Sequence, residues 1–121
     1  MRADRIFFFP RGGGKEAPRK EEVIRYLCEA LTRDWKAVDA DTLESLVTQR
    51  ESALPTRLSP SLAVPHAVVS GTGETHLAAA VISSGVRWDS DREHPVRLVM
   101  LLAGNRESHL GVLSELARRL R

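Results

Sequence analysis

The sequence predicts an α/β domain built on a single mixed β-sheet that is flanked by helices on both faces. Short apolar runs of strand length alternate along the chain with amphipathic helical patterns, and this alternation favours a largely parallel or mixed sheet covered by helices. The chain has 121 residues, the size of one domain. It contains no internal repeat and no linker, so we expect residues 1–121 to form a single domain.

The first half of the chain predicts one strand and two helices. The apolar run from Ile6 to Phe9 predicts a short buried strand, closed by Pro10 and the glycines at 12–14. A helix follows from Lys20, because apolar residues then recur at helical spacing on one stripe: Val23, Ile24, Leu27, Cys28 and Leu31.

The second predicted helix begins near Asp39 or Asp41 and ends before Pro55. Asp41 and Glu44 together resemble a capping box. The apolar stripe of this helix consists of Leu43, Leu46 and Val47, and the next position on the stripe is Arg50.

The second half predicts three strands and a final helix. Leu62 to Val64 forms a short strand that stops at Pro65, with His66 immediately after it. The continuously apolar run from Leu77 to Ile82 suits a central strand. Residues 83–95 read as a polar loop that contains Trp88, and residues 96–103 as another strand. Asn105 then caps a helix with the stripe Leu113, Leu116, Ala117 and Leu120.

Composition narrows the function classes. The formal net charge is only +2 and the basic residues are scattered, so the concentrated basic face of a nucleic-acid-binding protein is missing. No apolar stretch is long enough to span a bilayer or to act as a signal peptide. The single cysteine, Cys28, lies on a core stripe and reads as a buried reduced thiol. We therefore expect a cytoplasmic protein that neither binds nucleic acid nor inserts into a membrane.

Three polar side chains occupy positions where the pattern asks for apolar or structural residues. Arg50 lies on a core stripe, and His109 shares the core-facing side of the last helix. His66 follows a strand end that Pro65 stiffens, near the edge where open α/β sheets bind ligands. Each has an ordinary alternative: Arg50 can extend its head to water, and His109 can pair with a backbone carbonyl. The combination of all three makes a site credible.

These residues fit phosphoryl transfer better than other chemistry. We find no plausible hydrolytic set in which a histidine with a carboxylate orienter could activate a serine or a cysteine. The four histidines share no metal-ligand spacing, and the glycines at 12–14 lack the pattern of a phosphate loop. We expect neither metal nor cofactor. A neutral imidazole is, however, a good nucleophile toward phosphorus, and an arginine supplies the positive charge that the phosphoryl oxygens require.

Several motifs in the sequence also resemble those of a known family. The signature consists of Arg50-Glu51, then Leu54-Pro55-Thr56, then Leu62 to Ala67, which contains Pro65-His66. Later matches follow in the same order: Gly85 to Asp89, Pro95-Val96, Leu98 to Leu102, His109-Leu110, Leu113-Ser114 and Leu116-Ala117. The pattern resembles the fructose/mannitol-type enzyme IIA domains of the bacterial phosphotransferase system, which include the nitrogen-regulatory IIA proteins. The resemblance covers about Lys20 to the end and leaves 1–19 as an atypical N-terminal segment.

The resemblance implies roles for the three polar residues. His66 matches the phosphorylated histidine, His109 the second active-site histidine, and Arg50 the arginine that neutralises the phosphate. It also implies an HPr-type phosphocarrier as donor, and a IIB domain or a regulated protein as recipient. The alternative that stays open is a IIA-like regulatory module that binds a transporter or a kinase without phosphoryl turnover.

Overall fold

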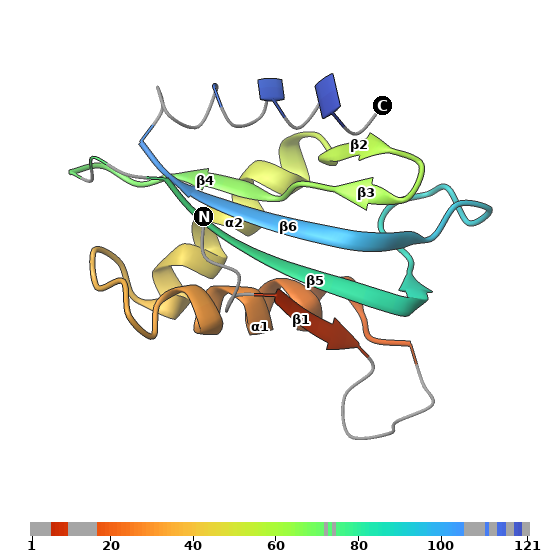
Figure 1. The fold of residues 1–121 in the computed structure, drawn as a ribbon, viewed down its shortest axis with the longest axis horizontal. Helices are drawn as coiled ribbons and strands as arrows, with labels where there is room; N and C mark the ends of the chain where they lie inside the picture. Colours follow the sequence, from red (N-terminus) through yellow and green to blue (C-terminus); the bar gives the residue numbers. More distant parts are fainter. Residues whose placement is uncertain are drawn as a thin grey trace.

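A computed structural model describes residues 6–9, 17–71, 73, 75–105, 111, 114–115 and 118–119 of the chain. These residues form two helices and one mixed sheet of six strands (Figure 1). The elements in chain order are β1 (Ile6–Phe9), α1 (Lys20–Leu31), α2 (Ala40–Ala53), β2 (Arg57–Ser59), β3 (Leu62–Ala63), β4 (His66–Val68), β5 (Thr75–Val86) and β6 (Val96–Gly104). The prediction of an α/β fold on a single mixed sheet is confirmed.

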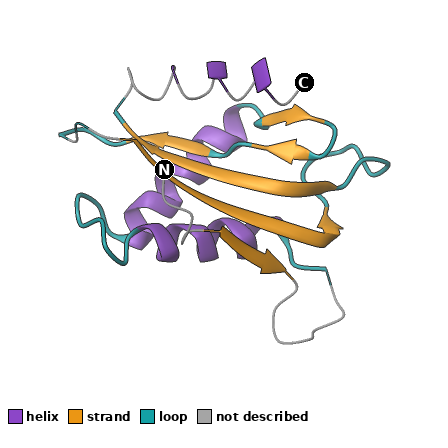
Figure 2. Ribbon diagram, viewed as in Figure 1, coloured by secondary structure: helices purple, strands orange, loops and turns teal. Residues whose placement is uncertain are grey.

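The sheet has the strand order β1-β5-β6-β3-β2, and β4 also pairs with β6. The long strands β5 and β6 are antiparallel and form its centre. β1 runs parallel to β5, and both β3 and β4 run parallel to β6. Figure 2 shows these orange strands with the two purple helices beside them. Because β3 and β4 pair with successive parts of β6, they act as one strand that Pro65 interrupts.

Helix α1 forms as its apolar stripe predicts. All five stripe residues, from Val23 to Leu31, are buried, whereas Glu21, Glu22 and Glu29 stay exposed. The negative charges of the two acidic residues in the first turn interact favourably with the positive end of the helix dipole and stabilise the helix. Helix α1 is therefore stabilised by burial of its apolar face, while its polar face stays in contact with water.

Helix α2 begins where an aspartate caps it. The side chain of Asp39 accepts a hydrogen bond from the backbone N–H of Thr42 at 2.7 Å, so Asp39 is the N-cap and the predicted capping box at Asp41 is wrong. The cap at Asp39 satisfies an N–H that the first helical turn leaves without a partner. The helix ends at Ala53, and Leu54 is extended because the following Pro55 disfavours helical geometry.

The core lies mainly between the helices and one face of the sheet. Leu27 and Leu43 from α1 and α2 pack there with Ala80 and Leu101. A smaller cluster covers the opposite face and contains Leu62, Val64, Leu77, Ala79 and Leu102. Cys28 is fully buried, as predicted, and burial raises the pKa of its thiol to about 12.

The prediction that β1 is a buried strand is half wrong. Phe7 and Phe9 pack edge-to-face against Tyr26 of α1, but Ile6 and Phe8 are exposed. The reason is position, since β1 pairs with β5 at the end of the described strand order and α1 covers one side of it. Consecutive strand residues point to opposite faces, so only alternate residues are packed.

The segment after the central run also differs from the prediction. Residues 83–86, expected to begin a loop, continue β5 to Val86. The register between β5 and β6 shifts between Val81 and Val86, and Gly85 adopts a φ of +76°. This irregularity accounts for the polar run within a strand. The short strand β2 was not predicted, because Arg57-Leu58-Ser59 carries no apolar pattern.

The predicted final helix falls mostly outside the described residues. This holds for His109 and for all four positions of its expected stripe, and likewise for Pro10 and the glycines at 12–14. Within the part of the chain that the structure describes, no helix has both the length and the apolar character needed to cross a membrane.

Candidate functional site

His66 is the first residue of β4, and the backbone around it is fixed from both sides. Pro65 has no N–H to donate, yet its carbonyl accepts a hydrogen bond from Leu102 N–H at 3.0 Å. His66 then pairs with Leu102 in the parallel ladder to β6. The sequence predicted His66 directly after a strand end, and the structure shows in addition that it begins the next strand. The side chain is half-buried.

The imidazole of His66 is oriented by the backbone of its own segment. Nδ1 lies 2.8 Å from the carbonyl oxygen of Val64. A carbonyl oxygen can only accept, so Nδ1 carries the proton and donates it. In the neutral ring the lone pair is therefore on Nε2. The local fold thus favours the tautomer in which the lone pair of the neutral ring is on Nε2.

Arg50 lies in the last turn of α2, at the end of the apolar stripe. Leu43 and Val47 on that stripe are fully buried, whereas Arg50 is half-buried. Its Nη1 donates to the carbonyl of Leu54 at 3.1 Å, which satisfies one of the acceptors that a helix end leaves open. This bond uses one of the five N–H donors of the guanidinium.

The structure brings the elements of two predicted site residues together. Helix α2, which carries Arg50, packs against β4, which carries His66. The third residue, His109, lies outside the described residues. The described part of the candidate site therefore consists of an imidazole on a strand and a guanidinium at the neighbouring helix end.

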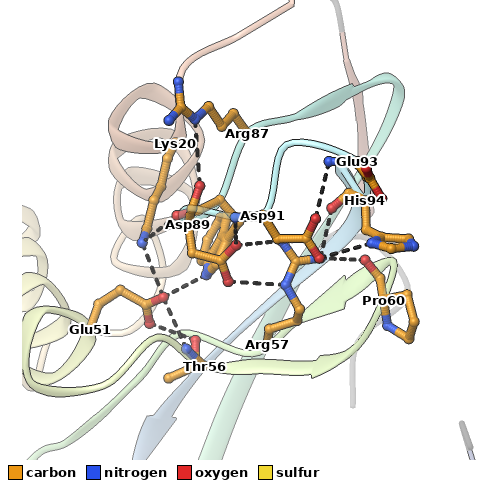
Figure 3. Close-up of polar contacts among 11 residues, drawn as sticks. Lys20, Glu51, Thr56, Arg57, Pro60, Arg87, Asp89, Asp91, Glu93 and His94 are labelled. Atoms are coloured by element: carbon orange, nitrogen blue, oxygen red, sulfur yellow. Dashed lines mark hydrogen bonds and ion pairs between the residues drawn. The ribbon is translucent and has the colours of Figure 1, made fainter.

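Sequence reasoning missed a cluster of polar residues, which we call the Glu51 cluster: Lys20, Glu51, Thr56 and Trp88. Figure 3 shows Glu51 with Lys20 and Thr56 beside it. Glu51 is only 5% exposed. Its Oε1 accepts from the indole Nε1–H of Trp88 at 2.5 Å and from the backbone N–H of Thr56 at 3.1 Å. Its Oε2 accepts from the Thr56 hydroxyl at 2.6 Å.

Lys20 neutralises the buried carboxylate of the Glu51 cluster. Its Nζ lies 3.2 Å from Glu51 Oε1, donates to the carbonyl of Trp88 at 3.0 Å, and stands 4.6 Å from the centroid of the Trp88 ring. One signal in the sequence pointed to such a cluster. A tryptophan in a polar segment needs an acceptor for its indole N–H once it is buried, and Trp88 is 3% exposed.

A second ion pair fixes the loop that carries Trp88. Arg57 Nη2 and Nε donate to the two carboxylate oxygens of Asp89 at 2.8 and 3.0 Å, and the guanidinium also donates to the carbonyls of Pro60 and His94 (Figure 3). Hydrogen bonding from Arg57 holds the pKa of the Asp89 carboxyl below its usual value. This pair ties residues 87–95 to the β2–β3 hairpin.

Comparison with known proteins places this chain in a family. Residues 13–121 match the family model of the phosphoenolpyruvate-dependent sugar phosphotransferase system, EIIA 2. The chain belongs to this family.

One curated relative and two solved structures illustrate the likeness. The mannitol-specific EIICBA component of Escherichia coli K12 is 30% identical over 110 residues, which are 88% of this chain and 17% of that protein. The complex of enzyme IIA mannitol with phosphorylated enzyme IIB mannitol from E. coli gives a TM-score of 0.76 at 28% identity and covers 99% of this chain and 81% of that chain. The nitrogen regulatory protein IIA-Ntr of Neisseria meningitidis shares the fold, with a TM-score of 0.79 at 23% identity, over 96% of this chain and 77% of that one.

Proposed function

We propose that this protein is a phosphocarrier that accepts a phosphoryl group on Nε2 of His66. The observation that carries the proposal is the 2.8 Å hydrogen bond between His66 Nδ1 and the carbonyl of Val64. It fixes the proton on Nδ1, so the lone pair of the neutral ring is on the other nitrogen. Membership of the EIIA 2 family supports phosphoryl transfer as the reaction.

The transfer step needs little covalent help from the protein. A P–N bond forms at Nε2 as the bond between phosphorus and the donor's histidine breaks, and the proton on Nδ1 stays in place. The ring gains positive charge during this step, and the Val64 carbonyl stabilises that charge. Arg50 contributes a planar donor fork for the phosphoryl oxygens, and His109 is proposed as a further donor.

The donor in this proposal is an HPr-type phosphocarrier protein, and the recipient is a IIB-type domain or a regulated protein. The E. coli mannitol IIA enzyme, a structural neighbour, has been solved in a complex with phosphorylated IIB mannitol. A IIB-type recipient is therefore the first to test. We place the exchange in the cytoplasm, where such donors reside.

Incubation with phosphoenolpyruvate, enzyme I and HPr tests the proposal. The parent protein should take up acid-labile phosphate, and His66→Ala should take up none while it keeps the thermal unfolding midpoint within a few degrees. His94→Ala is the matched control, because His94 is an exposed histidine whose side chain pairs with Asp91. Equal labelling of His66→Ala and parent would overturn the assignment, and a parent without label would favour a regulatory module that lacks turnover.

A further inference from the structure

The Glu51 cluster is connected to the ring of His66 by hydrogen bonds. Glu51 holds Thr56 by both its backbone N–H and its hydroxyl. The carbonyl of Thr56 accepts from the N–H of Val64 at 2.9 Å. The carbonyl of Val64 in turn accepts from Nδ1 of His66 at 2.8 Å. A continuous series of bonds thus runs from the buried carboxylate to the candidate nucleophile.

Val64 is the sensitive link in this series. It lies between β3, which ends at Ala63, and β4, which begins at His66. The paired residues of the ladder to β6 are interrupted there. The hydrogen bond that the Val64 N–H donates to the carbonyl of Thr56 therefore helps fix the backbone of Val64. It thereby helps fix the position of the Val64 carbonyl, which orients the His66 ring. A shift of Thr56 would be passed directly to that carbonyl.

The stability of the fold does not by itself require a buried charged cluster at this position. A buried carboxylate is costly unless it is paired and fully hydrogen-bonded, and a well-packed apolar group often stabilises a fold equally well. Here Lys20 of α1 and Trp88, which follows β5, both hold the carboxylate in place. The result is a carboxylate with a fixed position, anchored from segments far apart in the sequence.

We propose that Glu51 is a positioning residue that sets the tautomer and orientation of His66 through Thr56 and Val64. This inference rests on the proposed function for its effect on rate, but not for its effect on the ring. The carboxylate does not touch the phosphoryl group. It determines how often Nε2 presents its lone pair for attack.

Two substitutions at Thr56 and one at Trp88 test this inference. Thr56→Val keeps the shape and the backbone N–H but loses the hydroxyl bond to Glu51, and Thr56→Ser restores that bond. Trp88→Phe keeps an aromatic ring but removes the indole N–H. The two readouts are the ¹⁵N shifts of the His66 ring in mildly alkaline solution, which report the tautomer, and single-turnover transfer from phosphorylated HPr.

We expect Thr56→Val and Trp88→Phe to lower the fraction of ring with its proton on Nδ1 and to slow transfer by about fivefold, while Thr56→Ser stays within about twofold of the parent. Asp41→Asn is the control, because it weakens an exposed ion pair between Arg25 of α1 and Asp41 of α2 that involves no residue of the series. It should leave the ring signals unchanged.

Unchanged ring signals and rates in both Thr56→Val and Trp88→Phe would overturn the inference while leaving the phosphocarrier intact. If Thr56→Val does not fold, Trp88→Phe alone decides. A parent that accepts no phosphate would remove the proposed function, but the ring signals would still decide whether the Glu51 cluster positions His66. A shift in Asp41→Asn as large as that in Thr56→Val would also count against it, because general loosening would then explain the effect.

Discussion

The guanidinium of Arg50 combines two tasks at the end of α2. It donates to the carbonyl of Leu54, which places a cation at the negative end of the helix dipole. It also stands on the helix that packs against the strand of His66. Its remaining N–H donors form a rigid fork of the kind that binds phosphoryl oxygens in pairs.

Arg50→Lys separates these two tasks. Lysine keeps the cation at the helix end but loses the fork, so the free energy of unfolding should stay close to that of the parent. Phosphate acceptance should fall roughly tenfold, equivalent to about 1.4 kcal/mol of transition-state stabilisation. Single-turnover transfer from phosphorylated HPr and thermal unfolding measure the two effects.

Arg33→Lys is the matched control for this prediction. Arg33 is an exposed arginine in the turn after α1, and its replacement should change neither the transfer rate nor the stability. An Arg50→Lys variant that accepts phosphate at the parental rate would mean that the guanidinium acts only at the helix end.

Single residues also show how far the sequence predicts the site. His66 could be singled out because it follows a proline at a strand end, and Arg50 because it is a charged residue on an apolar helical stripe. The orientation of the His66 ring could not, because it depends on where the Val64 carbonyl points. Glu51 was missed for a similar reason. Its two anchors, Lys20 and Trp88, are 31 and 37 residues away in the sequence, and no local pattern predicts that they meet.

At the scale of elements, β5 depends on a glycine that no other residue can replace without strain. Gly85 combines a φ of +76° with a close approach to the next strand, since an added Cβ would lie 2.8 Å from Cβ of Pro95. Gly71 has a similar φ of +82°, but an added Cβ there meets nothing within 4 Å. Substitution of Gly71 therefore measures the free-energy cost of the backbone conformation alone, whereas substitution of Gly85 adds the cost of a steric clash.

Gly71→Ala should lower the free energy of unfolding by about 1 kcal/mol, the cost of a left-handed conformation in an L-residue. Gly85→Ala should lower it by about 2 kcal/mol more, because the packing between β5 and the start of β6 must shift. Urea denaturation of both variants measures the difference. Equal losses would show that Pro95 moves away freely and that only the backbone conformation matters at Gly85.

Elements differed in how well the sequence predicted them. The start of helix α1 at Lys20 and its apolar stripe through Leu31 were predicted correctly, because apolar residues recur there at helical spacing over three turns. The exposed half of β1 was not predicted, because an unbroken apolar run gives no alternation from which to tell a covered face from an open one. The extension of β5 to Val86 was hidden by polar residues at its irregular end.

For the whole molecule, composition and alternation predicted the class of fold but not the order of the strands. The sheet places β1 beside β5 and β6 between β5 and β3. Pairings such as Phe7 with Ala80 join residues far apart in the sequence, and one sequence carries no local sign of them.

The buried thiol of Cys28 gives the molecule an internal reporter of its own opening. As the only cysteine in the chain, it yields a single signal with an alkylating reagent. Its pKa of about 12 and its full burial keep it unreactive while α1 lies on the sheet. Alkylation therefore proceeds only through states in which α1 has separated from its neighbours. Its rate across increasing urea distinguishes local release of that helix, which depends little on denaturant, from cooperative unfolding of the domain, which depends on it steeply.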